Sequence, residues 1–492
     1  MKNFCALVFA LAAHGAYAAT SCEDMKNLKL ADARVTRAES VVPAPEWKYP
    51  ASAFDFFNVG PKGARKPFCR VALTIEKQIE VEVWLPQDWN GRFQGVGNGG
   101  LSGDFNYPAL GVALAGGYAT ASTDTGHKTK NMFDTDWVVG NPQAAIDFGH
   151  RAHHLMAVTG KAVVAAHYGK PADRAYYSGC SSGGWQGLTE AQKYPGDYDG
   201  IVAGAPAINF TRLQMRPVME ERILAEPGTA ITPDLNRKLV ETAIAKCDSI
   251  DGVQDGLIDD PRKCDFDPAS VPGITPAQAR AAKGLYGPMT SRGGRKLYPG
   301  AAFGTELIIG LPGPTLGPAQ PLIMTMFQQE KVLFTQASYD PDVHLPLLEK
   351  RFGEDMSAMQ ADLSAFAKRG GKLILYHGWS DPLLSPYNTL DYYDAVVKRM
   401  GSAQVGGFAK LFMAPGMAHC AGGPGPNTFD AVDAVVKWVE HGTAPAQLVA
   451  THVSPADGKP GRTRPLCPYP QVAKYSGSGS TDEAGNFRCS AP

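Results

Sequence analysis

Hydrophobic residues recur along this chain with two periods, and the change from one to the other predicts the order of strands and helices. Val71–Leu85 alternates between apolar and polar residues and is rich in β-branched and aromatic side chains, so it predicts two early strands. Helical spacing over Gln143–Tyr168, which ends at Gly169, and over Gly184–Tyr194 predicts two helices. Short apolar runs predict further strands at Arg92–Val96, Gly117–Ser122, Arg174–Ser178 and Gly200–Ala205.

This alternation is interrupted once and then resumes. Residues 207–354 contain scattered helical stretches, Asp/Gly turns and a Gly/Pro-rich segment at 310–321, but no regular succession of strand and helix. Beyond them the pattern predicts helices at Met356–Arg369, Pro386–Arg399 and Thr428–His441, and strands at Lys372–Tyr376 and Lys410–Ala414. We therefore expect an α/β domain formed by residues 19–206 and 355–492, with a lid domain inserted at 207–354.

The first 18 residues have the pattern of a secretory signal peptide. Lys2 provides a positive charge, Phe4–Ala13 is apolar, and Ala16-Tyr17-Ala18 fits an A-x-A cleavage site. This apolar stretch is too short to cross about 30 Å of hydrocarbon as a helix. We therefore expect a secreted or periplasmic protein; an uncleaved anchor and a lipoprotein modified at Cys22 are the alternatives.

Composition and charge narrow the function classes. Of 492 residues, 44% are hydrophobic and 19% are charged, and the formal net charge is −1. No run of Lys and Arg exceeds two residues, so nothing indicates binding to nucleic acid or to an acidic membrane. No segment indicates a protein partner, and we expect a small-molecule substrate.

Cleavage after Ala18 removes Cys5 and leaves an even set of eight cysteines, which in an exported chain predicts disulfides rather than a metal site. Eight cysteines allow 105 pairings, so spacing alone does not fix the connectivity. Locality favours Cys247–Cys264 and Cys467–Cys489, each closing a short loop. Cys22–Cys69 would attach the N-terminal arm, and Cys180 and Cys420 remain.

Ser181 lies in Gly179-Cys180-Ser181-Ser182-Gly183, which fits the G-x-S-x-G nucleophile elbow, a strand-to-helix turn that exposes a serine hydroxyl above an α/β sheet. In α/β hydrolases an acid and then a histidine follow the serine in the chain. Here Asp381 and His419 each follow a predicted strand, in that order. The three residues predict a catalytic triad, in which His419 accepts the serine proton and Asp381 orients the imidazole.

These residues also have structural alternatives. Asp381 precedes Pro382 and could cap a helix, and His377 is a second histidine in the same loop, although it precedes the acid. His150, His153 and His154 predict a solvated or satisfied helix face rather than a metal site. A binding protein that has lost catalysis is the non-enzyme alternative.

Acyl transfer also needs backbone N–H donors near the developing oxyanion. We expect one from Ser182, directly after the nucleophile at a helix N-terminus. The other should come from the glycine cluster Gly97-Asn98-Gly99-Gly100, where Gly100 is best placed. A plain tight turn is the alternative interpretation of this cluster.

Asp248, Asp251 and Asp255 fall within eight residues, among glycines that permit sharp turns. Ca²⁺ binds such carboxylates together with backbone carbonyls, but the spacing is not that of an EF-hand. From spacing alone, a capped Asp/Gly turn fits as well as a metal site. Cys247 and Cys264 bracket the segment. We expect a structural role, because the segment lies in the insertion, away from the triad loops.

Several motifs together resemble those of the tannase and feruloyl esterase family of secreted α/β hydrolases. They span nearly the whole mature chain, and the paired Cys-Ser and His-Cys motifs are specific. The matching stretches are Trp89–Phe93, Gly97–Gly100, Thr123–His127, Gly179–Gly184, Asp199–Pro206, Cys247–Leu257, Tyr376–Asp381, Pro415–Cys420 and Arg464–Pro470.

The resemblance implies an α/β-hydrolase fold and a serine carboxylic ester hydrolase that acts through an acyl-enzyme. It implies the triad above and a disulfide between Cys180 and Cys420. Substrates of the family are esters of aromatic acids such as gallate and ferulate. The resemblance also implies a structural Ca²⁺ bound by the side chains of Asp248, Asp251 and Asp255 and by the carbonyls of Val253 and Leu257.

Specificity in this family depends mainly on the lid. Because a mono(2-hydroxyethyl) terephthalate hydrolase resembles this chain closely, a terephthalate-type or broad aryl esterase is the alternative. That alternative calls for a lid arginine to bind a carboxylate, for which Arg292 and Arg295 are candidates by location only. Apolar lid residues that could contact the substrate ring or form core are Phe303, Leu307, Met324, Met326 and Phe327.

Overall fold

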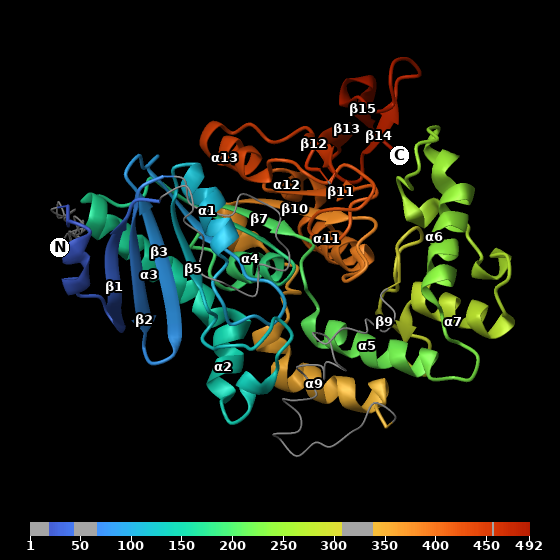
Figure 1. The fold of residues 1–492 in the computed structure, drawn as a ribbon, viewed down its shortest axis with the longest axis horizontal. Helices are drawn as coiled ribbons and strands as arrows, with labels where there is room; N and C mark the ends of the chain where they lie inside the picture. Colours follow the sequence, from blue (N-terminus) through green and yellow to red (C-terminus); the bar gives the residue numbers. More distant parts are fainter. Residues whose placement is uncertain (1–18, 44–65, 308–337, 455–456) are drawn as a thin grey trace, which may run out of the picture.

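The computed structural model describes residues 19–43, 66–307, 338–454 and 457–492. Within them, nine strands form one sheet in the order β1-β2-β3-β5-β4-β6-β7-β10-β11 (Figure 1). Their bounds are β1 (Ala33–Val41), β2 (Phe68–Ile75), β3 (Ile79–Pro86), β4 (Arg92–Val96), β5 (Ala119–Thr123), β6 (Arg174–Cys180), β7 (Gly200–Gly204), β10 (Lys372–Gly378) and β11 (Ala409–Ala414). The predicted signal peptide lies outside the described residues.

The direction of the strands decides where the active-site loops meet. The pairs β1–β2, β2–β3 and β3–β5 are antiparallel. All pairs from β5 through β4, β6, β7 and β10 to β11 are parallel. The carboxyl ends of β4, β6, β10 and β11 therefore lie at one edge of the sheet, where open α/β sheets place their ligands.

Strands with a clear hydrophobic signal are the buried ones. β5 and β7 are buried along their whole length, as expected for central strands covered on both faces. The sequence pattern missed β1, an edge strand whose residues are mostly exposed. Its Arg34, Arg37 and Glu39 provide no apolar alternation, because the solvent side of an edge strand favours charge.

Helices cover both faces of the sheet. Leu373 and Leu375 of β10 share one core with Leu188 of α4, whereas Ile374 packs on the other face with Val435 of α13. The helices α3, α4 and α11 lie on the first face, and α1 and α13 lie on the second. The bounds are α1 (Tyr107–Ala115), α2 (Pro142–Ile146), α3 (Ala152–Tyr168), α4 (Ser182–Lys193), α11 (Pro386–Met400), α12 (Ser402–Gly406) and α13 (Ala431–His441).

Two of the helix predictions need comment. The stretch predicted as one helix contains α2, a π-helical turn at Asp147–Arg151 and α3, and it ends at Gly169 with a φ of 71°. The helix predicted at Met356–Arg369 is wrong: α9 (Pro341–Met356) ends where it should begin, and only α10 (Ser364–Lys368) is helical. Buried residues between α9 and α10 join the main core in a non-helical conformation, so tertiary packing overrides the local pattern.

The insertion between β7 and β10 has a core of its own. It contains α5 (Phe210–Leu224), α6 (Pro233–Cys247), α7 (Pro276–Tyr286), β8 (Met289–Thr290), β9 (Lys296–Tyr298) and α9. α6 and α7 stand apart from the sheet in Figure 1 and contribute buried residues such as Leu239 and Ala282 to this core. The domain boundaries and the lid role of this insertion stay predictions.

The chain ends in two β hairpins, β12 (Leu448–Val453) with β13 (Pro460–Leu466) and β14 (Val472–Tyr475) with β15 (Phe487–Ser490). Among the described residues four disulfides are formed: Cys22–Cys69, Cys180–Cys420, Cys247–Cys264 and Cys467–Cys489. These pairings include the one that only the family resemblance implied.

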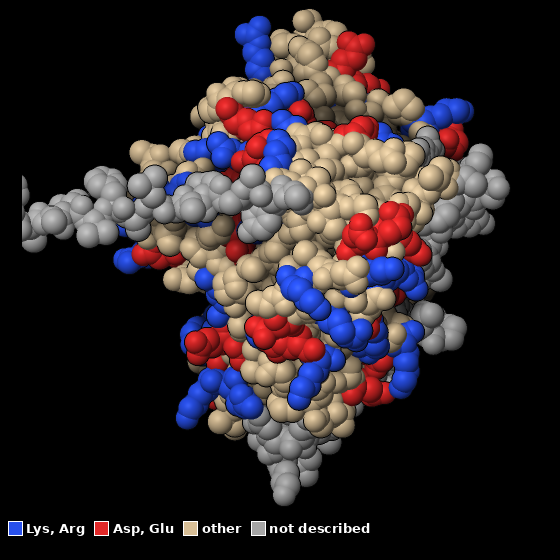
Figure 2. All heavy atoms as spheres, turned by 90° about the vertical axis from the view of Figure 1, so that its left-hand side faces the viewer, with Lys and Arg blue, Asp and Glu red and all other residues tan. Residues whose placement is uncertain are grey.

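The surface agrees with the balanced composition. Figure 2 shows Lys and Arg side chains interspersed with Asp and Glu over one face of the molecule, without a continuous basic area. Among the helices of the described residues, none has the length and apolar character needed to cross a bilayer.

Candidate active site

Ser181 occupies the sharp turn between β6 and α4. Its φ of 63° lies in the left-handed region, which residues other than glycine rarely adopt. The turn is tight because backbones approach closely: a Cβ on Gly184 would lie 2.2 Å from the carbonyl oxygen of Gly204. The Ser181 N–H donates to the same oxygen at 3.0 Å. The geometry is that of a nucleophile elbow at the carboxyl edge of the sheet.

Asp381 and His419 meet at the same edge, in the loops after β10 and β11. The imidazole Nδ1 lies 2.7 Å from Asp381 Oδ2, and Oδ1 accepts the backbone N–H groups of Leu383 and Leu384 at 2.8 and 2.9 Å. Burial alone would raise the pKa of Asp381, but the neighbouring imidazoles outweigh it and hold that pKa well below its usual value. The carboxylate is therefore ionised and orients the ring, as a triad acid must.

A second histidine, His377, reaches the same carboxylate from β10. Its Nε2 lies 3.1 Å from Asp381 Oδ2 and 3.1 Å from the carbonyl oxygen of Leu384. Its Nδ1 lies 2.7 Å from the Thr389 hydroxyl, and the side chain is fully buried. Both ring nitrogens of His377 therefore have hydrogen-bond partners next to the acid. This leaves His419 as the histidine beside the nucleophile turn.

The Cys180–Cys420 disulfide joins the nucleophile turn to the histidine loop. Its Cα atoms are 5.8 Å apart, and both Cys420 and Ser181, the residue after Cys180, have a φ of 63°. No hydrogen bond between the Ser181 hydroxyl and His419 is formed within the described chain. Such bonds are often long without substrate and shorten in the Michaelis complex. The catalytic roles of the three residues stay a prediction, which this arrangement supports.

The two residues expected to form the oxyanion hole are in direct contact. The Ser182 hydroxyl donates to the carbonyl oxygen of Gly100 at 2.6 Å, and Ser182 is buried. Gly100 has a φ of 58°, and a Cβ there would lie 2.6 Å from the Met132 carbonyl oxygen. Only glycine fits this position without strain. The sequence indicated the backbone N–H of Ser182, but not this role of its side chain.

Two buried histidines form hydrogen bonds with the glycine loop, the segment that begins with the cluster Gly97–Gly100. His127 Nε2–H donates to the carbonyl oxygen of Leu101 at 3.0 Å, and His153 Nε2–H donates to Asn98 Oδ1 at 2.9 Å. Burial lowers the pKa of His127 to about 4 and that of His153 to about 3, so both rings are neutral at neutral pH. His153 Nδ1 has no hydrogen-bond partner among the described residues, so the ring is only partly satisfied, and neither contact with the loop had a signal in the sequence.

The Asp-rich loop lies closer to the triad than predicted. Gly416 stands three residues before His419, and a Cβ there would lie 2.5 Å from the side chain of Leu257. The expectation that this loop lies away from the triad loops is therefore wrong. The insertion starts at the carboxyl end of β7, the sheet edge where the triad loops lie, so its irregular segments can fold back against them.

The carboxylates of this loop have partners within the protein. Asp248 accepts the backbone N–H of Asp255 at 3.0 Å, and Asp251 accepts that of Val253 at 2.9 Å. Asp255 forms a buried ion pair with Arg464. Among the residues that the structure describes, no three His, Cys, Asp or Glu side chains converge as a metal-binding group. The loop thus has the hydrogen bonds of an Asp turn, and calcium binding stays a prediction.

The lid residues considered from the sequence fall into three groups. Arg292 and Arg295 are exposed, and Arg292 forms an ion pair with Asp340. Phe303 and Leu307 pack in the core of the insertion rather than at the sheet edge. Met324, Met326 and Phe327 lie outside the described residues.

Comparison with known proteins finds relatives along most of the chain. The family model described as tannase and feruloyl esterase matches residues 64–293 and 323–490. The chain is 32% identical to the mono(2-hydroxyethyl) terephthalate hydrolase of Piscinibacter sakaiensis, over 96% of this chain and 92% of that protein. It is 33% identical to a probable feruloyl esterase of Arthroderma benhamiae, over 84% of this chain and 83% of that protein.

Solved structures show the same architecture. Feruloyl esterase B from Aspergillus oryzae superimposes with a TM-score of 0.85 at 28% identity, covering 95% of this chain and 99% of that one. Tannin acyl hydrolase from Aspergillus niger has a TM-score of 0.78 at 21% identity, covering 94% and 92%, which is a likeness of fold. The predicted α/β-hydrolase fold is confirmed.

Proposed function

The chain belongs to the tannase and feruloyl esterase family, and we propose that it hydrolyses esters of aromatic acids, such as gallate or ferulate, through an acyl-enzyme. One observation carries the proposal. A hydrogen-bonded Asp381–His419 pair lies at the same sheet edge as Ser181 in its elbow, with a disulfide between the two turns. The relatives named above are esterases or hydrolases of feruloyl and terephthalate esters by name.

In the proposed reaction, the Ser181 hydroxyl attacks the ester carbonyl while His419 Nε2 takes its proton. Asp381, bonded to Nδ1, stabilises the imidazolium that forms. The bond from the carbonyl carbon to the alcohol oxygen then breaks, and His419 protonates the leaving alcohol. Water attacks the acyl group on Ser181 and gives a proton to His419, which returns it to the serine as the acid leaves.

The negative oxygen of each tetrahedral intermediate would accept N–H groups from Ser182 and Gly100. One such donor contributes about 2.7–4 kcal/mol to lowering the barrier. The bond from the Ser182 hydroxyl to the Gly100 carbonyl supports this assignment, because it fixes the two residues relative to each other before substrate arrives.

A terephthalate-type or broad aryl esterase is the second candidate, supported by the 32% identity to the terephthalate monoester hydrolase. Both candidates use the same triad and differ in the lid. The exposure of Arg292 and Arg295 gives no support for either as a carboxylate-binding residue. Esters of phenolic acids therefore remain the first choice.

Two experiments test the function. A fluorophosphonate probe should label the folded protein but not Ser181→Ala, since the probe needs an activated serine. Equal labelling of both, or labelling of neither, would remove the hydrolase proposal. Initial rates on methyl gallate, methyl ferulate and mono(2-hydroxyethyl) terephthalate then separate the substrate classes, and the highest kcat/KM on the terephthalate ester would favour the second candidate.

We also propose that the Asp-rich loop binds a structural Ca²⁺, through Asp248, Asp251, Asp255 and the carbonyls of Val253 and Leu257. The donor chemistry fits, since these are hard oxygen ligands in a loop closed by the Cys247–Cys264 disulfide. The ion would stabilise the folded state by binding it preferentially. A chelator should lower the melting temperature of the wild type by several degrees but leave Asp251→Asn unchanged. No shift in the wild type would contradict the site.

We infer, finally, that the protein is exported. Four disulfides suit an oxidising compartment, and residues 1–18 have the pattern of a signal peptide. N-terminal sequencing of the protein from periplasm or medium should begin at Ala19. A chain that starts at Met1 would contradict cleavage.

A further inference from the structure

The Asp-rich loop contacts the histidine loop, which follows β11 and carries His419. Through Arg262 it also contacts the acid loop, which follows β10 and carries Asp381. Arg262 lies on the short 3-10 turn Pro261–Lys263, just before Cys264 closes the loop. Its guanidinium makes a two-pronged contact with Asp260, from Nε to Oδ1 at 2.8 Å and from Nη2 to Oδ2 at 2.7 Å. The Asp260 side chain is buried and that of Arg262 is 39% exposed, and the two-pronged contact sets the orientation of the planar fork.

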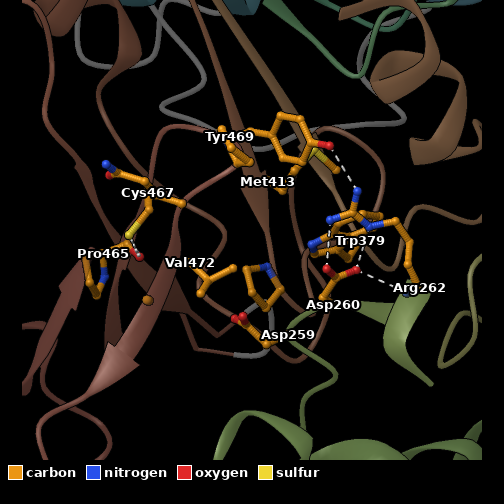
Figure 3. A pocket seen from close by; sticks show the side chains of 13 residues that line it. Asp259, Asp260, Arg262, Trp379, Met413, Pro465, Cys467, Tyr469 and Val472 are labelled. Atoms are coloured by element: carbon orange, nitrogen blue, oxygen red, sulfur yellow. Dashed lines mark hydrogen bonds and ion pairs between the residues drawn. The ribbon is translucent and has the colours of Figure 1, made fainter. Parts of the chain in front are cut away.

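Held in this way, the guanidinium lies over two aromatic rings (Figure 3). Its central carbon is 5.5 Å from the ring centre of Trp379 and 5.3 Å from that of Tyr469, whose hydroxyl accepts Nη1–H at 3.1 Å. The cavity that these residues border has a volume of about 30 Å³, room for roughly one water, so it is no substrate site. The contacts therefore serve packing and position.

Trp379 connects this contact to the triad. It stands two residues before Asp381, is 4% exposed, and donates its backbone N–H to the end of β11 at 2.9 Å. The next residue, Ser380, donates its N–H at 3.0 Å to the carbonyl of Met417, two residues before His419. Trp379 thus lies where the acid loop and the histidine loop contact each other.

We propose that Arg262 is a positioning residue: by fixing Trp379, it holds the acid loop in the arrangement in which Asp381 orients His419. The proposal rests on the proposed ester hydrolysis, and Arg262 acts through its contact with Trp379 rather than on the reacting atoms. Through it, the Asp-rich loop of the insertion supports the triad. A misplacement of about 1 Å can cost about 100-fold in turnover. Losing a supporting contact should cost less, about tenfold.

Substitutions at Arg262 test this. Arg262→Met keeps an unbranched apolar stem and removes the fork and the charge. We expect turnover about tenfold lower with KM within twofold of the wild type. Arg262→Lys restores the charge without the planar fork, so it should recover only part of the loss. Lys263→Met, the exposed neighbour, is the matched control and should retain wild-type turnover.

A double variant tells positioning from general destabilisation. If Arg262 acts through Asp381, Arg262→Met should cost nothing further in an Asp381→Asn background. An equal tenfold loss in both backgrounds overturns the proposal. So does a loss of activity that follows the folded fraction alone, with unchanged turnover per folded molecule.

A readout without catalysis separates this proposal from the proposed function. The proton between His419 Nδ1 and Asp381 should give a low-field NMR resonance, which Arg262→Met shifts or broadens and Lys263→Met does not. An unmoved resonance in Arg262→Met overturns the positioning role even in an active esterase. A shifted resonance in a chain that hydrolyses no ester supports the positioning role and removes only the proposed function.

Discussion

The nucleophile side and the base side of the active site are stabilised by different kinds of interaction. On the nucleophile side, neutral hydrogen bonds fix the glycine loop: Ser182 to Gly100, His127 to Leu101 and His153 to Asn98. On the base side, the ionised carboxylate of Asp381 accepts hydrogen bonds from two imidazoles. The guanidinium of Arg262 packs against the loop that carries this carboxylate.

The difference follows from what each side has to do. An oxyanion hole needs N–H dipoles aimed at one point, and a fixed charge nearby would alter the potential there. The base side must stabilise an imidazolium, which requires a buried negative charge, and that charge needs its own donors. The Cys180–Cys420 disulfide is the covalent link between the two sides.

Removing the charge on the base side should have the largest effect. Asp381→Asn keeps the shape but favours the wrong imidazole tautomer, so we expect turnover to fall about 10⁴-fold with little change in melting temperature. Single-turnover kinetics with the aromatic ester measure this. A loss of less than tenfold would mean that His419 is not oriented by this acid.

Cutting the link between the sides should have the next largest effect. In Cys180→Ala/Cys420→Ala we expect turnover to fall about 10- to 100-fold with KM nearly constant, because the serine–imidazole geometry loosens. Cys22→Ala/Cys69→Ala is the control: it removes the disulfide between the N-terminal segment and β2 and should lower stability without lowering turnover. Equal turnover in both double variants would refute a geometric role of the bridge.

On the nucleophile side, a neutral contact should matter less. Ser182→Ala leaves the backbone donor in place but frees the Gly100 carbonyl, and we expect about a tenfold loss of turnover that Ser182→Thr partly restores. Ser102→Ala removes a buried hydroxyl near the same loop that has no hydrogen-bond partner among the described residues, and it should stay near wild type. If both alanine variants behave alike, the Ser182 hydroxyl does not position the loop.

Substituting the neutral histidines should have the smallest effect on turnover at neutral pH. In acid, however, it should change the stability of the protein. The pKa of His127 is about 4 in the folded state against 6.5 in the unfolded chain, so the unfolded chain binds more protons between these values. The contribution of His127 to the free energy of unfolding is therefore full above about pH 6.5 and falls by roughly 3 kcal/mol as the pH drops to 4.

Denaturant unfolding at several pH values checks this. His127→Gln keeps a donor for the Leu101 carbonyl and cannot titrate, so it should flatten the decline in the free energy of unfolding. His441→Gln, at the exposed end of α13, is the control and should leave the decline unchanged. A decline in His127→Gln as steep as in the wild type would assign the acid sensitivity to other groups.

Much of the site could be predicted because its residue types stand at the ends of recognisable strands. The elbow serine, the acid and the histidine each follow a short apolar run, and a parallel sheet brings such positions to one edge. The helix expected at Met356–Arg369 and the missed strand β1 show the limit. In both places the local pattern was weaker than the packing that finally decided the conformation.

The sequence by itself determined the chemistry: which residues are nucleophile, base and acid candidates, and that eight cysteines would pair. Only the tertiary structure decided what supports them, namely His127 behind the glycine loop, His377 behind the acid, and Arg262 against Trp379. These contacts join residues far apart in the chain, and each is made by a single side chain in an irregular segment. Periodicity encodes which face of an element is buried, but it carries no information about which loop another loop will meet.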